Sequence, residues 1–143
     1  MKKKLNSVLL VDDDASDNFL HRRVIENAKI ADRIEVAKNG KEALKLLTTE
    51  GYFDNPDHSC SQPELIFLDI NMPVMDGWEF LDAFSKLKNI EKEKTVIVIL
   101  TTSLNPADKT RAEKLIACGC FQYKPLTLDI INGILRNRFP DYL

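Results

Sequence analysis

The stretch Val8-Leu9-Leu10-Val11-Asp12-Asp13-Asp14 joins a four-residue apolar run directly to three aspartates. A short run that is apolar at every position is typical of a strand covered on both faces of a parallel sheet. Two later runs, at 65–68 and 96–100, share this character and are followed at once by Asp69 and Thr101. We therefore predict three buried central strands, each with a polar residue at its carboxyl end.

Weaker strand patterns and helical patterns fill the chain between these runs. The segments at 33–37 and 120–123 alternate apolar with polar residues, as half-buried edge strands do. A helical pattern follows each strand, beginning after residues that suit a helix cap: Asp14, Asn39, Asp76, Asn105 and Thr127. In the first helix the predicted apolar positions are Phe19, Leu20, Val24 and Ala28, whereas His21 and His58 are expected at the surface.

Five strand–helix repeats predict an α/β fold with a parallel sheet. Placing the three apolar strands in the centre gives the strand order 2-1-3-4-5, a flavodoxin-like (βα)5 doubly wound sandwich. Strands one and three flank the topological switch point, where open α/β sheets bind ligands at the carboxyl ends of their strands. We therefore expect one edge of the sheet to gather Asp12, Asp13, Asp69, Thr101 and Lys124.

The length of 143 residues and the composition narrow the class of protein. One domain spanning residues 1–143 is expected, without an output domain and with a surface loop at 51–63. The net charge of −2 argues against nucleic-acid and membrane-surface binding, and no apolar run is long enough for a membrane span. The absence of a signal-peptide pattern favours a cytoplasmic protein. The three cysteines, Cys60, Cys118 and Cys120, are interpreted as reduced thiols.

Carboxylates gathered at one edge repel one another unless a cation neutralises them. Two carboxylates about 5 Å apart repel by roughly 3 kcal/mol at an effective dielectric of about 20. Lys124 supplies one positive charge, and a ligand set made of oxygen alone favours Mg²⁺. A carboxylate beside a cation, an ammonium and a hydroxyl suits phosphoryl transfer, with the carboxylate as nucleophile. We predict Asp69 as that nucleophile, because it stands alone after its strand whereas Asp12 and Asp13 can share the metal.

Four motifs contain the polar residues at the predicted strand ends. They are Leu-Leu-Val-Asp-Asp-Asp at 9–14, Leu-Asp-Ile-Asn-Met-Pro-Val-Met-Asp-Gly at 68–77, Leu-Thr-Thr-Ser at 100–103 and Tyr-Lys-Pro at 123–125. Together they resemble the receiver domain of two-component response regulators. The resemblance covers nearly the whole chain, and the motifs occur in order at predicted strand ends. The motif at 100–103 and the long loop before the third strand are similar to stand-alone receivers associated with phytochrome-type kinases.

The resemblance implies Asp69 as the phosphoacceptor and Mg²⁺ as the cofactor. Asp13 would bind the metal directly, Asp12 directly or through water, and Asn71 through its backbone carbonyl. Lys124 would pair with Asp69 and later with a phosphoryl oxygen, and its peptide bond to the following proline would be cis.

The resemblance also implies switching and modulating residues. Thr101 would be the switch hydroxyl and Phe121 the switch aromatic. Thr102, Ser103 and Met72 would modulate the site, since Thr102 replaces a frequently smaller residue and is expected to slow attacking water. The phosphoryl donor would be a histidine kinase or a phosphotransfer protein. The signal would leave through the surface of helix four, strand five and helix five, toward a protein partner or a second copy.

Three other functions fit parts of the sequence less well. A Mg²⁺-dependent phosphatase of the haloacid-dehalogenase type would be an enzyme with an aspartyl-phosphate intermediate, but it needs an aspartate where Asn71 stands. A flavodoxin-like FMN carrier needs a phosphate-binding loop where three aspartates would repel the phosphate. A receiver that binds partners without phosphorylation would not need the full set of acidic, threonine and lysine residues. We therefore expect a phosphorylation switch without separate substrate turnover.

Overall fold

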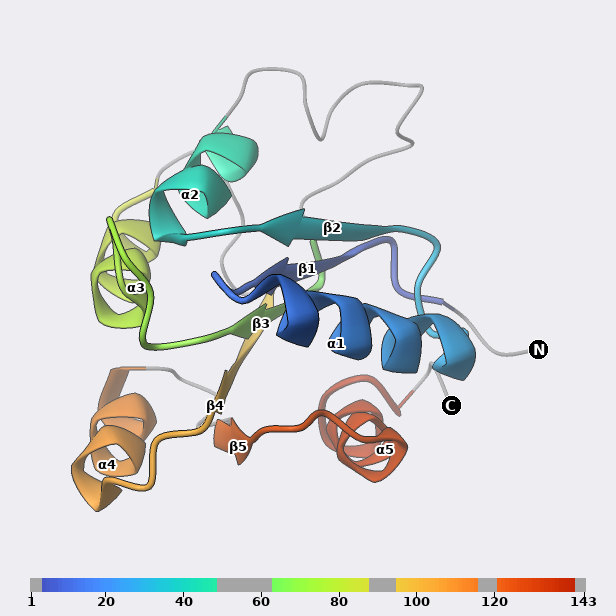
Figure 1. Cartoon of the computed structure of the whole chain (residues 1–143). Coiled ribbons are helices and arrows are strands. Elements are labelled where there is room, and N and C mark those ends of the chain that lie inside the picture. Colours follow the sequence, from blue (N-terminus) through green and yellow to red (C-terminus); the bar gives the residue numbers. More distant parts are fainter. Residues whose placement is uncertain (1–3, 49–62, 88–94, 116–120, 141–143) are drawn as a thin grey trace.

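The computed structural model describes residues 4–48, 63–87, 95–115 and 121–140 (Figure 1). Within these residues, strands and helices alternate along the chain as the sequence predicts. The strands are β1 (Val8–Val11), β2 (Ile34–Ala37), β3 (Leu65–Leu68), β4 (Val96–Thr101) and β5 (Phe121–Tyr123). The helices are α1 (Ala15–Ala28), α2 (Gly40–Thr48), α3 (Gly77–Ser85), α4 (Pro106–Leu115) and α5 (Leu128–Arg138).

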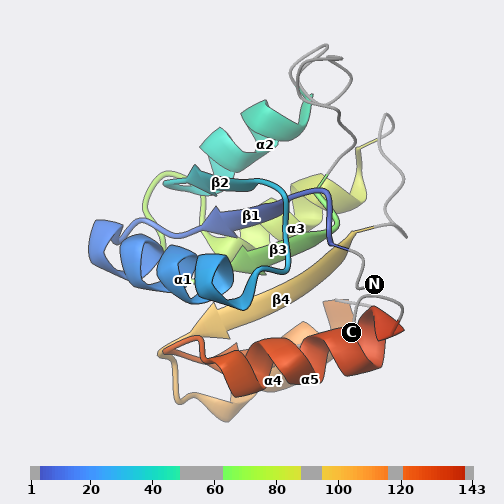
Figure 2. The ribbon, with the colours of Figure 1, turned by 90° about the vertical axis from the view of Figure 1, so that its right-hand side faces the viewer.

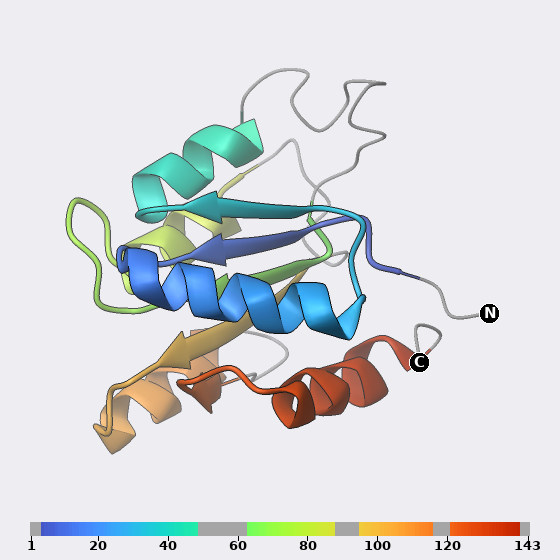
Figure 3. The same ribbon diagram turned by 45° about the vertical axis from the view of Figure 1, so that its right-hand side comes forward.

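The five strands form one sheet in the order β2-β1-β3-β4-β5, which confirms the predicted topology. All four neighbouring pairs are parallel, so the strands end at a common edge (Figure 3). In register, Val11 pairs with Leu68, and Thr101 pairs with Tyr123. Asp12 and Asp69, which follow the first pair, therefore emerge side by side, and Lys124 emerges next to the end of β4.

Alternation along the central strands divides the core into two layers. Leu9, Ile66 and Ile99 pack into the apolar cluster shared with α2 and α3, whereas Leu10 and Phe67 face the cluster shared with α1 and α5. Figures 1 and 2 show the same division, with α1 and α5 on one face of the sheet and α2, α3 and α4 on the other. Helices on both faces explain why these strands are apolar at every position.

Helix caps lie at the predicted residues. The Asp14 carboxylate accepts the amide N–H groups of Ser16 and Asp17 at the start of α1. Asp76 and Glu79 form a complete capping box at the start of α3. Side-chain oxygens at the other three predicted caps accept amide N–H groups in the first turns of α2, α4 and α5: Asn39, Asn105 and Thr127.

Two of the four predicted apolar positions of α1, Val24 and Ala28, are partly buried against the core, but the other two are not. Phe19 and Leu20 are 61% and 55% exposed, and the helix instead buries Asn18, His21 and Ile25. Asn18, His21 and Ile25 are spaced three and four residues apart, so they share one helical face. That face begins at the polar edge of the sheet, where the Asn18 side-chain amide donates to the Asp12 carbonyl at 2.8 Å. His21 is therefore a buried residue, and burial lowers its pKa.

Several predictions fall outside the described residues. They concern His58, Cys60, Cys118, Cys120 and the loop at 51–63 except its last residue, Pro63, which is buried. Among the helices that the structure describes, none combines the length and the apolar character that crossing a bilayer requires.

Candidate functional site

Two adjacent strand ends bring three carboxylates together. Asp12 and Asp13 follow β1 and Asp69 follows β3, and the Asp69 amide donates to the Val11 carbonyl at 2.9 Å. One oxygen from each of the three carboxylates lies within 4.8 Å of the others. Asp12 and Asp69 are buried and Asp13 is exposed. The clustering of these aspartates that the sequence predicts is thus present.

Asp69 is a buried acid in a negative environment. Asp69 is 7% exposed, and its burial together with the neighbouring Asp12 carboxylate raises the pKa of Asp69 to about 6. The Lys124 ammonium and hydrogen bonds from the amides of Ile70 and Asn71 act in the opposite direction. A cation at this position would favour the ionised, nucleophilic form of Asp69.

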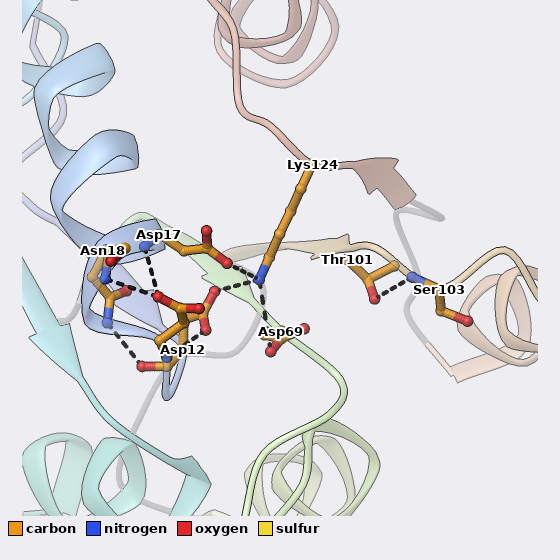
Figure 4. Close-up of polar contacts among 9 residues, drawn as sticks. Asp12, Asp17, Asn18, Asp69, Thr101, Ser103 and Lys124 are labelled. Carbon is orange, nitrogen blue, oxygen red and sulfur yellow. Dashed lines mark hydrogen bonds and ion pairs between the residues drawn. The ribbon is translucent and has the colours of Figure 1, made fainter.

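Lys124 reaches the acidic cluster from the end of β5 (Figure 4). Its backbone amide donates to the Thr101 carbonyl at 2.9 Å, which holds it beside β4. Its Nζ lies 2.7 Å from Asp12 Oδ2, 2.7 Å from Asp17 Oδ2 and 3.8 Å from Asp69 Oδ2. Burial alone would lower the pKa of Lys124, but hydrogen bonds to Asp12 and Asp17 raise it above its usual value.

The expected pairing of Lys124 with Asp69 is present as an ion pair at 3.8 Å, but the two shorter contacts of the ammonium are with Asp12 and Asp17. The ammonium lies within ion-pair distance of Asp69 but hydrogen-bonds to Asp12 and Asp17. Sequence reasoning missed Asp17, which occupies the first turn of α1. An acidic residue there is common because it complements the helix dipole, so its type carried no signal for a role at the site.

Hydrogen bonds fix the turn between β1 and α1. Asp12 Oδ1 accepts the Asp14 amide at 2.9 Å, and the Asp12 carbonyl accepts the Asn18 side chain. Asp12 is thereby oriented by its own turn while its second oxygen contacts Lys124. Asn18 is a second residue that the sequence analysis missed, and its spacing from the buried Ile25 was the available signal.

Thr101 ends β4 at the same edge of the sheet (Figure 4). It is fully buried, and its hydroxyl accepts the Ser103 amide at 3.1 Å. Thr102 is exposed, whereas Ser103 is half-buried and donates a short hydrogen bond to Asp108 in the first turn of α4. The segment between β4 and α4 is thus tied to both elements, and the roles of Thr101, Thr102 and Ser103 stay predictions.

Phe121 is buried in the apolar cluster that includes residues of α2 and α3. Its ring meets the ring of Tyr123 edge-on at a centroid distance of 5.4 Å. Phe121 is therefore a core residue in this structure, and its switching role stays a prediction. The cis peptide bond between Lys124 and Pro125 is confirmed.

The segment from Asn71 to Gly77 connects the acidic cluster to α3. Asn71 is exposed and Met72 is buried in the α2–α3 cluster. A Cβ atom on Gly77 would lie 2.7 Å from the Asp69 carbonyl oxygen and 2.8 Å from Ile70 Cα, so glycine is required for this close approach. The start of α3 is thus pressed against the backbone that carries Asp69.

The donor set fits a hard divalent cation. The cluster offers carboxylate oxygens from Asp12, Asp13 and Asp69, two of them buried, without a nitrogen or sulfur ligand among the described residues of the group. Oxygen ligands of this kind suit Mg²⁺ or Mn²⁺.

Comparisons with known proteins place this geometry in a family. The model of the response regulator receiver domain matches residues 8–135. The response regulator Rcp1 of Synechocystis sp. is 32% identical over 101 residues, which cover 71% of this chain and 65% of Rcp1. A protein-glutamate methylesterase/protein-glutamine glutaminase of Methanococcoides burtonii is 30% identical over 128 residues, which cover 88% of this chain. The chain spans 65% of the first of these relatives and 32% of the second, less than two thirds of either length.

Solved structures agree with the family match. A two-component response regulator from Cytophaga hutchinsonii has a TM-score of 0.77 at 32% identity, over 94% of this chain and 97% of that chain. The phosphorylated cyanobacterial phytochrome response regulator RcpA has a TM-score of 0.71 at 27% identity, over 96% and 93% of the two chains. The Mn²⁺-bound form of response regulator Rcp1 has a TM-score of 0.70 at 29% identity, over 91% of each chain. This chain belongs to the response regulator receiver domain family.

Proposed function

We propose that this chain is a phosphorylation switch that accepts a phosphoryl group on Asp69 with the help of Mg²⁺. The observation that carries the proposal is the placement of Asp69, buried beside Asp12 and Asp13 and within 3.8 Å of the Lys124 ammonium. A buried carboxylate with a raised pKa is a nucleophile that a cation can activate. The family match weighs against the phosphatase and FMN-carrier alternatives.

The donor is a histidine kinase or a phosphotransfer protein with a phosphorylated histidine. An Asp69 carboxylate oxygen forms a bond to phosphorus while the bond from phosphorus to the donor's imidazole nitrogen breaks. The imidazole leaves with that electron pair and takes up a proton. Lys124 faces the negative charge that develops on the phosphoryl oxygens, and Thr101 supplies a hydroxyl from the neighbouring strand end. Hydrolysis by water later returns Asp69 and inorganic phosphate.

Mg²⁺ would neutralise charge on Asp69 and on the phosphoryl oxygens. Asp12, Asp13 and Asp69 would hold the ion, with the backbone carbonyl of Asn71 as a further ligand. Two structural neighbours support this assignment, since one is the Mn²⁺-bound form of Rcp1 and another is the phosphorylated response regulator RcpA. The exposed Thr102 side chain hinders the attack of water on the phosphoryl group and so sets the lifetime of phosphorylated Asp69. Ser103 and Met72 shape the chain segments that follow Thr101 and Asp69.

The output surface consists of α4, β5 and α5. The phosphoryl group on Asp69 carries a charge of about −2 and attracts Lys124 and the Thr101 hydroxyl, and Phe121 responds behind them. A protein partner or a second copy reads this surface, and neither nucleic acid nor a membrane is expected as the target. The switch acts in the cytoplasm. Its similarity to RcpA supports a phytochrome-type kinase as the donor.

The direct test is incubation with acetyl phosphate and Mg²⁺, followed by intact-mass measurement. We expect one adduct of one phosphoryl group on the wild-type protein and none on Asp69→Asn. Asp76→Asn is the matched control, because it changes an aspartate that caps α3 and asparagine caps helices equally well. A wild-type protein that gains no phosphoryl group, or an Asp69→Asn variant that still gains one, contradicts the proposal.

A further inference from the structure

Asp17 contacts the site but has no part in the chemistry proposed above. Its Oδ2 lies 2.7 Å from Lys124 Nζ, the same distance as Asp12 Oδ2 and much closer than Asp69 Oδ2. Asp12 also belongs to the carboxylate cluster that suits a cation, whereas among the described residues that cluster does not include Asp17. Asp17 therefore binds the lysine from outside the candidate metal site.

The helix dipole explains the residue type at position 17 but not the direction of its side chain. An acidic residue in the first turn of α1 stabilises the helix wherever its carboxylate points. The Asp14 carboxylate already accepts the amides of Ser16 and Asp17, so the cap is complete without the Asp17 side chain. That side chain instead reaches a residue 107 positions away in the sequence (Figure 4).

The contacts of Lys124 imply a competition for its ammonium group. An ammonium group donates three hydrogen bonds, and Asp12 and Asp17 accept at 2.7 Å while Asp69 is too distant at 3.8 Å. A phosphoryl group on Asp69 would attract the ammonium, and a cation on Asp12 would weaken the hold of that carboxylate. Neither change involves the Asp17 carboxylate, which still contacts the ammonium.

We propose that Asp17 is a positioning residue that holds Lys124 on the α1 side of the site and opposes its movement to the phosphoryl group. The inference rests on the proposed function, because it concerns the partner that Lys124 leaves on phosphorylation. Asp17 thereby favours the unphosphorylated state. It also links the first turn of α1 to the segment that enters α5, since Lys124 lies four residues before that helix.

Beryllofluoride, which mimics a phosphoryl group on a carboxylate, makes this competition measurable at equilibrium. Calorimetric titration of the full chain in Mg²⁺ should show beryllofluoride binding to Asp17→Asn about threefold or more tighter than to the wild type. Asparagine keeps the size of the side chain and removes the charge that holds the ammonium. Asp17→Glu, which restores the charge, should return the affinity toward the wild-type value.

Two controls separate the specific contact from general charge effects. Asp14→Asn removes one charge from the same turn, keeps a good helix cap and changes an exposed residue, so its affinity should stay within about twofold of wild type. In a Lys124→Gln background, Asp17→Asn should have no larger effect than Asp14→Asn, since the competing ammonium is gone. Thermal unfolding of each variant checks folding, and Asp17→Ser replaces Asp17→Asn if the latter does not fold.

Unchanged or weaker binding by Asp17→Asn overturns the inference, and so does an equal gain in Asp14→Asn or in the Lys124→Gln background. Absence of beryllofluoride binding to the wild-type protein is a different result, because it removes the proposed function on which the inference rests.

Discussion

Helices α1 and α3 begin in similar ways but bury different surfaces. Each comes after a strand that a site carboxylate follows directly, and each is capped by an aspartate, Asp14 or Asp76. The inner face of α3 is apolar, with Phe80 and Phe84 buried at a ring-centroid distance of 5.9 Å. The fully buried residues of α1 are two polar residues and one large apolar residue, Asn18, His21 and Ile25, and Val24 and Ala28 are partly buried beside them.

The difference shows two ways of attaching a helix to the same edge of a sheet. Apolar burial holds α3, and its position does not depend on the charges of the site. Polar contacts to Asp12 and Lys124 hold the first turns of α1, so the position of α1 depends on those charges. A change at the acidic cluster therefore affects α1 more directly than α3.

The largest expected effect is a difference in the free energy of unfolding between two phenylalanine-to-alanine variants, one on each helix. Phe80→Ala should lower the free energy of unfolding by about 3–5 kcal/mol, because it opens a cavity in a fully buried part of α3. Phe19→Ala should change it by less than about 0.5 kcal/mol, because the side chain is exposed and contacts the Arg23 guanidinium 5.8 Å from its ring centre. Denaturant unfolding measures both, and equal losses would show that α1 also depends on apolar burial.

A somewhat smaller effect comes from the charge on Asp69. Because folding raises its pKa from 3.8 to about 6, the folded protein binds the proton more tightly than the unfolded chain does. The stability that Asp69 contributes is therefore complete below pH 3.8 and is lost as the pH rises through about 6. Without metal, Asp69→Asn should be more stable than wild type by about 2–3 kcal/mol at pH 7.

Unfolding of wild-type protein and Asp69→Asn between pH 4 and 7 tests this linkage. The difference in stability should shrink toward the acid end of this range, as Asp69 becomes protonated. A difference that stays constant with pH would mean that Asp69 titrates near its ordinary pKa.

Replacing two helical glycines with alanine should change the stability of the protein by smaller amounts and in opposite directions. Gly77→Ala should destabilise the protein by about 1–3 kcal/mol, because its Cβ would meet the backbone of Asp69 and Ile70. Gly133→Ala in α5 should stabilise it by about 0.5–1 kcal/mol, because a Cβ there meets nothing within 4 Å. If the start of α3 is pressed against the end of β3, thermal unfolding should show a lower melting temperature for Gly77→Ala and a higher one for Gly133→Ala.

Much of the fold was predictable because its signals are local. Three fully apolar runs identified the central strands, and their position in the chain fixed the strand order. Caps such as Asp76 are local signals, and so are the polar residues that immediately follow a strand. The aspartates of the cluster were therefore found without knowledge of the tertiary structure.

The residues that the first turns of α1 bury were not predictable by the same reasoning, although Val24 and Ala28 do pack against the core as predicted. Hydrophobic periodicity assigns adjacent apolar residues such as Phe19 and Leu20 to the core, but α1 faces the polar edge of the sheet with its first turns. The contact of Asp17 with Lys124 joins residues that are 107 positions apart, and both residue types are common where they stand. Contacts of this kind depend on the packing of α1 against β1 and α5, which no local pattern records.

Metal binding tests the central claim, that the strand ends build one site for a cation beside Asp69. Calorimetric titration with Mg²⁺ compares wild type with Asp13→Asn and Asp14→Asn, which change adjacent aspartates inside and outside the carboxylate cluster. We predict one binding site in the wild type, similar binding in Asp14→Asn and affinity at least about tenfold weaker in Asp13→Asn. Absence of binding heat in the wild type, or an equal loss in both variants, would contradict the account.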